Sequence, residues 1–241
     1  MYEAVLFDLD GTLLPMDQEQ FVHGYFGALC RRFAPLGYEP KRLIDTVWKG
    51  TSAMVKNDGG MSNCERFWQV FASVYGQEKL ADRPQFDDFY AKEFNEAAAQ
   101  TQPTPLADRC VKALKKKGYP VILATNPIFP RVATLARIGW AGLDAQDFAH
   151  ITTYENSARC KPNPDYYAGI CEAQRIHPAK CLMVGNDYVE DLAASQTGME
   201  VYLATDCLIA PEGTDLSAVP HGTLAELCAQ LETFPPFREG N

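Results

Sequence analysis

The sequence predicts an α/β protein: a doubly wound parallel sheet that carries an inserted all-helical domain. Short apolar runs typical of buried strands recur along the chain, and segments with helical periodicity lie between them. One long stretch near the N-terminus has helical periodicity and no strand candidate. The length of 241 residues suits one large domain, or one domain with an insert, because a single core stops growing at about 250 residues.

The expected strands are short and mostly apolar, as in sheets that are buried on both faces. The first covers residues 4–7, and the others follow at 119–124, 149–153, 181–184 and 200–203. Helical segments separate them at 105–117, 129–138, 163–175 and 188–197, with Gly118, Gly139 and Gly198 as helix stops. This alternation predicts an open, doubly wound parallel sheet.

Residues 17–101 have a different pattern. Phe21, Tyr25, Leu29 and Phe33 recur at a spacing of four residues, and three similar aromatic stripes follow them. We expect about four helices packed around an aromatic core of their own. The predicted division is a catalytic core of residues 1–16 and 102–241 and a cap domain of residues 17–101, with hinges at Pro15-Met16 and 100–105.

Composition excludes several classes of function. The net charge of −9 and the scattered basic residues disfavour nucleic acid as a partner. The apolar runs are far shorter than the roughly 20 residues that a membrane span needs, and the acidic N-terminus does not resemble a secretory signal. The eight cysteines form no CxxC pair, so we expect reduced thiols and a cytoplasmic protein. The tail, 233–241, is expected to fray.

The sharpest motif is Asp8-Leu9-Asp10-Gly11-Thr12, which directly follows the first strand. Two carboxylates at positions i and i+2 leave a strand on the same face. Both therefore project into the crevice beyond the carboxyl end of the strand, where open α/β sheets bind ligands. The alternative is a turn that merely closes the strand, with Gly11 at a positive φ angle.

Polar residues follow the other expected strands as well. Thr125 and Asn126 come directly after the second strand, and Lys161 precedes a helix that prolines open. Asp187 and Asp191 follow the fourth strand. Taken singly, these residues could be turns, helix caps or a solvated lysine. Because the strand ends share one edge of the sheet, together they predict a single site.

This set of motifs resembles the haloacid dehalogenase (HAD) superfamily of phosphohydrolases. Asp8-x-Asp10-Gly11-Thr12 is similar to its first motif, Thr125 to its second, Lys161 to its third, and Asp187 with Asp191 to its fourth. The helical insert between the first two motifs is similar to the subfamily with a helical C1 cap, which includes phosphoglycolate phosphatases and β-phosphoglucomutases. One departure is Gly185-Asn186-Asp187, where the family commonly has Gly-Asp. It leaves open whether Asp187 is the metal ligand or Asn186 and Asp191 share that role.

The resemblance implies an enzyme, a phosphatase that hydrolyses a small phosphorylated metabolite through an aspartyl-phosphate. Asp8 would be the nucleophile, because a covalent intermediate divides one difficult displacement into two steps. Asp10 would protonate the leaving alcohol and then deprotonate the hydrolytic water. Thr125, Asn126 and Lys161 would bind the phosphoryl oxygens, with Lys161 also counted as catalytic.

The resemblance also implies a metal site made by Asp8, Asp10, Asp187 and Asp191. These carboxylates contribute up to four negative charges against the single positive charge of Lys161, so a phosphate dianion would be repelled. A divalent cation is required, and hard oxygen ligands select Mg²⁺.

Two alternatives stay open: a phosphomutase of the same fold, and a non-catalytic module that binds a metabolite. A mutase needs a second anion site in the cap, for which Arg31, Arg32 and Lys49 are the candidates. A dehalogenase does not need an acid at position 10, and a phosphonatase needs a cap lysine, for which Lys49 and Lys56 are candidates. Substrate selection is expected from the cap, including segment 56–61. The oligomeric state cannot be read from the sequence.

Overall fold

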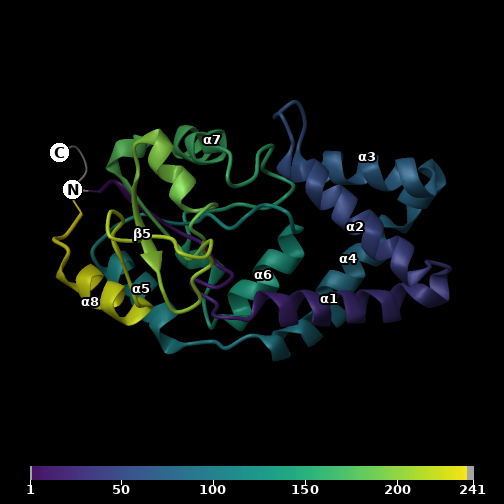
Figure 1. Cartoon of the computed structure of the whole chain (residues 1–241), viewed down its shortest axis with the longest axis horizontal. Coiled ribbons are helices and arrows are strands. Elements are labelled where there is room, and N and C mark those ends of the chain that lie inside the picture. Colours follow the sequence, from purple (N-terminus) through teal and green to yellow (C-terminus); the bar gives the residue numbers. More distant parts are fainter. Residues whose placement is uncertain (1, 238–241) are drawn as a thin grey trace.

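The computed structural model describes residues 2–237, and within them six parallel strands form one sheet (Figure 1). The strands are β1 (Ala4–Phe7), β2 (Val121–Leu123), β3 (His150–Ile151), β4 (Cys181–Gly185), β5 (Glu200–Ala204) and β6 (His221–Gly222). Their order is β3-β2-β1-β4-β5-β6, so the direction of winding reverses beside β1. Ligands of open α/β sheets bind at such a reversal, outside the carboxyl ends of the strands.

Helices cover both faces of the sheet. They are α5 (Pro105–Lys116), α6 (Arg131–Trp140), α7 (Pro164–Gln174) and α8 (Leu224–Thr233). The side chains of β1 alternate between the faces: Val5 and Phe7 pack in one core with α5 and α8, and Ala4 and Leu6 pack in a second core with α7. The doubly wound α/β fold predicted from the strand pattern is therefore confirmed.

The inserted region between β1 and β2 is helical, as predicted, and lies to one side of the sheet (Figure 1). Its α-helices are α1 (Gln18–Phe33), α2 (Pro40–Val55), α3 (Asn63–Tyr75) and α4 (Arg83–Ala91). Ser62 and Glu65 form a capping box that begins α3. The aromatic stripes meet in a shared core, where the rings of Phe33 and Phe86 stack at 4.0 Å.

Short 3₁₀ segments connect or extend these elements. They are η1 (Ala34–Leu36), η2 (Gln77–Asp82), η3 (Glu93–Gln100), η4 (Ala145–Asp147), η5 (Pro178–Lys180) and η6 (Leu192–Thr197). The two chain crossings between sheet and helices lie side by side, because Met16 and Thr101 form an antiparallel bridge. Gln102 also donates its backbone N–H to the carbonyl of Pro15 at 2.7 Å. The division into domains at these crossings stays a prediction.

Three local expectations were wrong, and two elements were not predicted. Residues 188–197 form a turn followed by η6 rather than one helix, and Gly139 lies inside α6 instead of ending it. β6 was not predicted because His221-Gly222 has no apolar run, and α8 was not predicted although its buried residues recur with helical spacing. The tail does not fray at residue 233, because Phe237 packs on Tyr119 with ring centroids 5.4 Å apart. The rest of the expected frayed segment, 238–241, lies outside the described residues.

No helix in the described part of the chain is both long and apolar enough to cross a membrane. All eight cysteines lie within residues 2–237, and each is a free thiol. Five of them are buried, in agreement with their position in apolar segments.

Candidate active site

The predicted site residues converge on one cavity of about 310 Å³. Asp8 and Asp10 follow β1, Thr125 and Asn126 follow β2, and the loop after β4 adds Asp187 and Asp191. These strands are neighbours in the sheet, so their carboxyl ends bring the six side chains to the same edge. Lys161, the remaining predicted residue, lies behind the cavity wall and bonds to two of these carboxylates.

Lys161 connects the first and fourth motifs through one hydrogen bond to each. Its buried ammonium donates to Oδ1 of Asp8 at 2.7 Å and to Oδ1 of Asp191 at 2.6 Å. Burial alone would lower the pKa of Lys161, but the two carboxylates outweigh burial and hold its pKa above the usual value. Burial, with the neighbouring charges of Asp191 and Asp10, raises the pKa of Asp8 despite the lysine. Lys161 is thus shared by two carboxylates, each of which accepts one hydrogen bond from it.

Asp10 is paired with a residue that the sequence did not point to, Arg137 of α6. One carboxylate oxygen, Oδ2, accepts a hydrogen bond from the Arg137 guanidinium, which is only 1% exposed. The guanidinium also lies 4.5 Å from the centre of the Phe129 ring, a cation–π contact that fixes its plane. The other oxygen of Asp10, Oδ1, is buried and has no hydrogen-bond partner among the described residues.

Two glycines allow close packing at the motif loops: Gly11 between the first and fourth motifs, and Gly185 within the fourth. Gly11 has a φ of +86°, and a Cβ there would lie 2.3 Å from the side-chain nitrogen of Asn186. Asn186 in turn accepts from the Thr12 hydroxyl at 2.9 Å and donates to the Cys207 carbonyl at 2.7 Å. A Cβ at Gly185 would lie 2.0 Å from a carboxylate oxygen of Asp191. Asn186 therefore ties the two motif loops together with both of its side-chain polar atoms.

Asp187 and Asp191 have different surroundings. Both oxygens of the buried Asp191 are used, since Oδ1 accepts from Lys161 and Oδ2 accepts from the backbone N–H of Asp187 at 2.9 Å. Asp187 accepts two backbone N–H groups, each at 2.8 Å, on its Oδ1 alone. Its Oδ2 accepts no hydrogen bond from the described residues, and the side chain lines the cavity.

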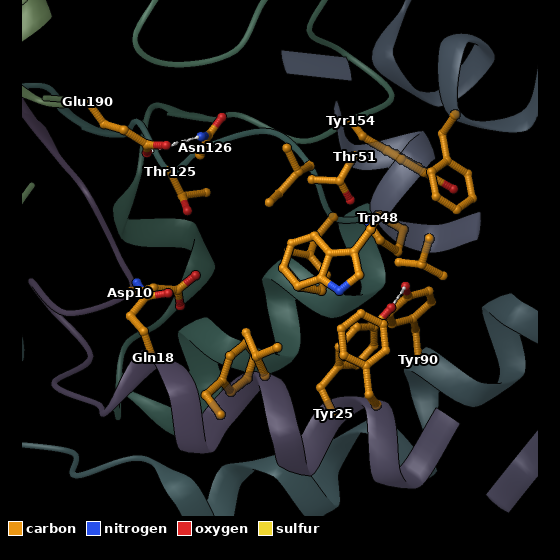
Figure 2. A pocket seen from close by; sticks show the side chains of 18 of the residues that line it. Asp10, Gln18, Tyr25, Trp48, Thr51, Tyr90, Thr125, Asn126, Tyr154 and Glu190 are labelled. Atoms are coloured by element: carbon orange, nitrogen blue, oxygen red, sulfur yellow. Dashed lines mark hydrogen bonds between the residues drawn. The ribbon is translucent and has the colours of Figure 1, made fainter. Parts of the chain in front are cut away.

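Thr125 and Asn126 line the cavity beside Glu190, which the sequence did not single out (Figure 2). Asn126 donates to both carboxylate oxygens of Glu190, at 2.9 and 3.0 Å. Burial raises the pKa of Glu190 to about 7, although Lys161 opposes the shift. We call this part of the lining the acidic end of the cavity. It consists of Asp8, Asp10, Thr125, Asn126, Asp187, Glu190 and Asp191.

Aromatic side chains form the opposite end of the cavity, and they come from the inserted helices and from the loop after β3. The aromatic end consists of Tyr25, Phe26, Trp48, Trp68, Tyr90 and Tyr154. Figure 2 shows four of these rings grouped apart from Asp10, Thr125 and Glu190. The expectation for segment 56–61 was wrong, because none of its residues, all of them described, lines the cavity. Asn57 instead holds that segment against α3 through a hydrogen bond to Asn63 at 2.9 Å.

Comparison with known proteins gives a consistent class. A family model described as haloacid dehalogenase-like hydrolase matches residues 2–197. The chain is 28% identical over 199 residues to a phosphoglycolate phosphatase of Psychrobacter arcticus, covering 80% of this chain and 79% of that protein. It is 24% identical over 239 residues to a bifunctional riboflavin kinase/FMN phosphatase of Arabidopsis thaliana, covering 98% and 57%.

A solved structure agrees in fold: a 2-haloacid dehalogenase from Pseudomonas syringae pv. Tomato DC3000 superposes with a TM-score of 0.62 at 20% identity, covering 95% of this chain and 99% of that one. The fold and the four motifs define a class of hydrolases that have a doubly wound parallel sheet and an inserted helical region. The chain belongs to the haloacid dehalogenase-like hydrolases. The resemblance drawn from its motifs is thereby confirmed.

The acidic end has the chemistry of a Mg²⁺ site. Its carboxylates offer only oxygen donors, and the Oδ2 of Asp187 has no partner among the described residues. No three His, Cys, Asp or Glu side chains of residues 2–237 form a complete metal cage. Mg²⁺ does not need one, because it commonly binds through one or two carboxylates, further oxygens and several waters. The residues present therefore fit this ion.

Proposed function

We propose that this chain is a phosphatase that hydrolyses a small phosphate monoester through an aspartyl-phosphate on Asp8. The observation that carries the proposal is the pairing of Asp8 with Lys161 beside Asp10, all at the carboxyl end of β1. A nucleophile, a group able to exchange a proton and a fixed cation thus lie at the same end of one cavity.

The reaction would proceed in two displacements. In the first, an oxygen of Asp8 forms a bond to phosphorus, the bond between phosphorus and the ester oxygen breaks, and Asp10 gives its proton to the leaving alcohol. In the second, Asp10 takes a proton from water, the water oxygen bonds to phosphorus, and the bond to Asp8 breaks. Inorganic phosphate leaves, and Asp8 and Asp10 return to their starting states.

Arg137 would act as a positioning residue for Asp10. It binds Oδ2, so only the unpartnered Oδ1 is left to exchange a proton with the ester oxygen or with water. Because the guanidinium is buried and also packs on Phe129, it fixes the carboxylate in one orientation. Holding the acid in place costs nothing at the moment of reaction.

Asp8, the backbone carbonyl of Asp10 and Asp187 would hold Mg²⁺. The ion supplies positive charge to the phosphoryl oxygens and offsets the excess of carboxylates. Among the residues of the fourth motif, Asp187 supports this assignment best, since one of its oxygens is unused while both polar side-chain atoms of Asn186 are bonded. A ligand role for Asp191 stays a prediction, and it would require Asp191 to give up a present hydrogen bond.

Thr125 would contact the phosphoryl oxygens. A contact from Lys161 stays a prediction, and it would require Lys161 to give up one of its bonds to Asp8 and Asp191 behind the cavity wall. Thr125 lines the cavity, and its own carbonyl is held by the hydroxyl of Tyr166 at 2.8 Å. The side-chain nitrogen of Asn126 donates to both carboxylate oxygens of Glu190, so a contact between Asn126 and a phosphoryl oxygen stays a prediction that would require this nitrogen to give up one of these bonds. These contacts would stabilise charge that develops during transfer.

The phosphomutase alternative has less support. It needs cap cations that reach the cavity to hold a second phosphate, but Arg31, Arg32 and Lys49 do not line it. Arg31 is paired with Glu96, and Arg32 lies 3.4 Å from Asp88. The lysines weighed for a phosphonatase, Lys49 and Lys56, do not line the cavity either.

A turnover assay with p-nitrophenyl phosphate tests the proposal. We expect multiple turnovers of phosphate release with Mg²⁺ and loss of activity in excess chelator. Binding of the ester without turnover would instead favour the non-catalytic module.

A further inference from the structure

The aromatic end of the cavity offers a binding surface for the leaving group of the substrate. Trp48 is 48% exposed although it is a large apolar side chain, and it lines the cavity, where Figure 2 shows its ring in one group with Tyr25 and Tyr90. One neighbour, Phe26, supports it with ring centroids 5.5 Å apart. An indole that is held on one side and open on the other offers a flat surface to a ligand.

The polar groups at this end are mostly satisfied by one another. The hydroxyls of Tyr25 and Tyr90 lie 2.9 Å apart and share a hydrogen bond, and Trp68 donates to the hydroxyl of Tyr154 at 3.4 Å. Each of these pairs leaves one hydroxyl hydrogen that the pair does not use, and Thr51 adds a further hydroxyl. A ligand here therefore meets chiefly the faces and edges of rings, with a few hydroxyl groups among them. Such a surface suits an apolar body with few polar atoms.

Cations are absent from the lining. Among the described residues no Lys, Arg or His lines the cavity. The two buried cations of the site, Lys161 and Arg137, are already paired with carboxylates. A leaving group with its own carboxylate would lose its hydration in this cavity and gain no opposite charge.

A cationic leaving group is the other possibility that an aromatic surface raises. One carboxyl group, Asp87 of α4, lines this part of the cavity. Asp87 is exposed to solvent, so water screens its charge and competes with a bound cation for it. The rings also pack mainly against each other, as in the 5.4 Å contact between Trp68 and Phe86, rather than around one point.

We propose that the substrate is a phosphate monoester whose leaving alcohol carries an uncharged aromatic ring, which stacks on Trp48 while the phosphate occupies the acidic end. This inference rests on the proposed phosphatase function and deepens it. It differs from the substrate named for the relative from Psychrobacter arcticus, phosphoglycolate, whose leaving alcohol is an anion.

Four primary alkyl esters test the proposal with the full chain and Mg²⁺: 2-phenylethyl phosphate, 2-cyclohexylethyl phosphate, phosphoglycolate and phosphocholine. All four release alkyl alcohols that need a proton, so differences in kcat/KM report mainly recognition. We expect the phenylethyl ester to exceed each of the others by about tenfold or more, the scale of a good aromatic contact. An equal or higher kcat/KM for any of the other three esters would overturn the proposal.

Acetyl phosphate separates this failure from failure of the proposed function. Its small leaving group does not reach the rings, so it reports the acidic end alone. Hydrolysis of acetyl phosphate together with a preference for phosphoglycolate or phosphocholine would overturn only the leaving-group proposal. Hydrolysis of none of the five compounds would overturn the phosphatase function, and the leaving-group proposal with it.

Substitutions at Trp48 locate the preference. Trp48→Ala should lower kcat/KM for 2-phenylethyl phosphate by about tenfold and leave acetyl phosphate within about twofold. Trp48→Lys should shift the preference toward phosphoglycolate by supplying the missing cation. Val55→Ala is the matched control, since Val55 is an exposed apolar residue of the same helix that does not line the cavity. Equal effects of Trp48→Ala and Val55→Ala on the phenylethyl ester would contradict the stacking.

Discussion

The acidic end and the aromatic end of the cavity differ in how their side chains are held. At the acidic end Asp8 and Asp10 are held by partners from another loop or helix, Lys161 and Arg137, and Asp187 is held by backbone N–H groups of its own loop. At the aromatic end rings hold rings, as Phe26 holds Trp48. Charge-assisted bonds fix atoms to a fraction of an ångström, whereas stacked rings define only a surface. From this difference we propose that the sheet edge specifies the reaction and that the inserted helices specify the leaving group.

The largest expected effect comes from breaking the acidic end while leaving the aromatic end intact. Asp8→Asn removes the nucleophile but keeps the shape of the side chain, so turnover should fall below about one per cent of the parent activity. Quenching of tryptophan fluorescence by 2-phenylethanol should be unchanged in the variant. Residual activity above that level would exclude Asp8 as the nucleophile.

The second test asks whether Asp10 is the acid. Asp10→Asn should slow the 2-phenylethyl ester by about 10²–10⁴, but it should slow the first step with p-nitrophenyl phosphate much less, because nitrophenolate leaves without a proton. Arg137→Gln should slow the alkyl ester by a smaller factor, about tenfold, and Arg137→Lys should recover part of that loss. Equal slowing of both esters would mean that Asp10 does not protonate the leaving group and only helps to shape the site.

The third test concerns the metal. Asp187→Ala should raise the Mg²⁺ concentration needed for half-maximal activity, and it should reduce the rise in Tm that Mg²⁺ produces without substrate. Asn186→Ala should instead lower the Tm in chelator, since it removes the bonds to Thr12 and Cys207. A larger Mg²⁺ effect from Asn186→Ala would reverse the assignment.

The smallest effect should appear in the pH dependence of stability. Because burial raises the pKa of Glu190 from 4.5 to about 7, the folded state binds a proton more tightly than the unfolded state. Stability from this residue is therefore lost as pH rises from about 4.5 to 7. Glu190→Gln should remove a decline on the order of 2 kcal/mol, measured by urea unfolding without divalent cations. Glu212→Gln, at an exposed position, is the control, and its stability should decline with pH as that of the parent does. If the stability of Glu190→Gln also declined like that of the parent, Glu190 would be excluded as the cause of the decline.

The sequence predicted the acidic end better than the aromatic end for a physical reason. Asp8, Thr125 and Asp187 each follow a strand, and strand ends can be found from local patterns. Arg137 lies 127 positions from its partner Asp10, on a helix where an arginine ordinarily faces solvent. Trp48 has the same spacing as true core residues, so periodicity alone does not distinguish a ring in the core from a ring that lines a cavity.

Contacts between residues far apart in the sequence also decided the roles within the fourth motif. The pattern Gly185-Asn186-Asp187 left the metal ligand open, and the bonds of Asn186 to Thr12 and Cys207 depend on a contact between distant loops. The secondary structure of the core was predictable where strands are long and apolar, as at β4. It was not predictable at β6, whose two residues pair only because β5 lies beside them.

A covalent phosphoryl group on Asp8 is the most direct test of the central claim. The Asp10→Asn variant is mixed with p-nitrophenyl phosphate and Mg²⁺, quenched in acid within the first turnover, and digested for mass spectrometry. We expect a burst of about one equivalent of nitrophenol and an equal amount of phosphorylated peptide that contains Asp8. Release of nitrophenol at the burst level with no phosphoryl group on that peptide would contradict the account.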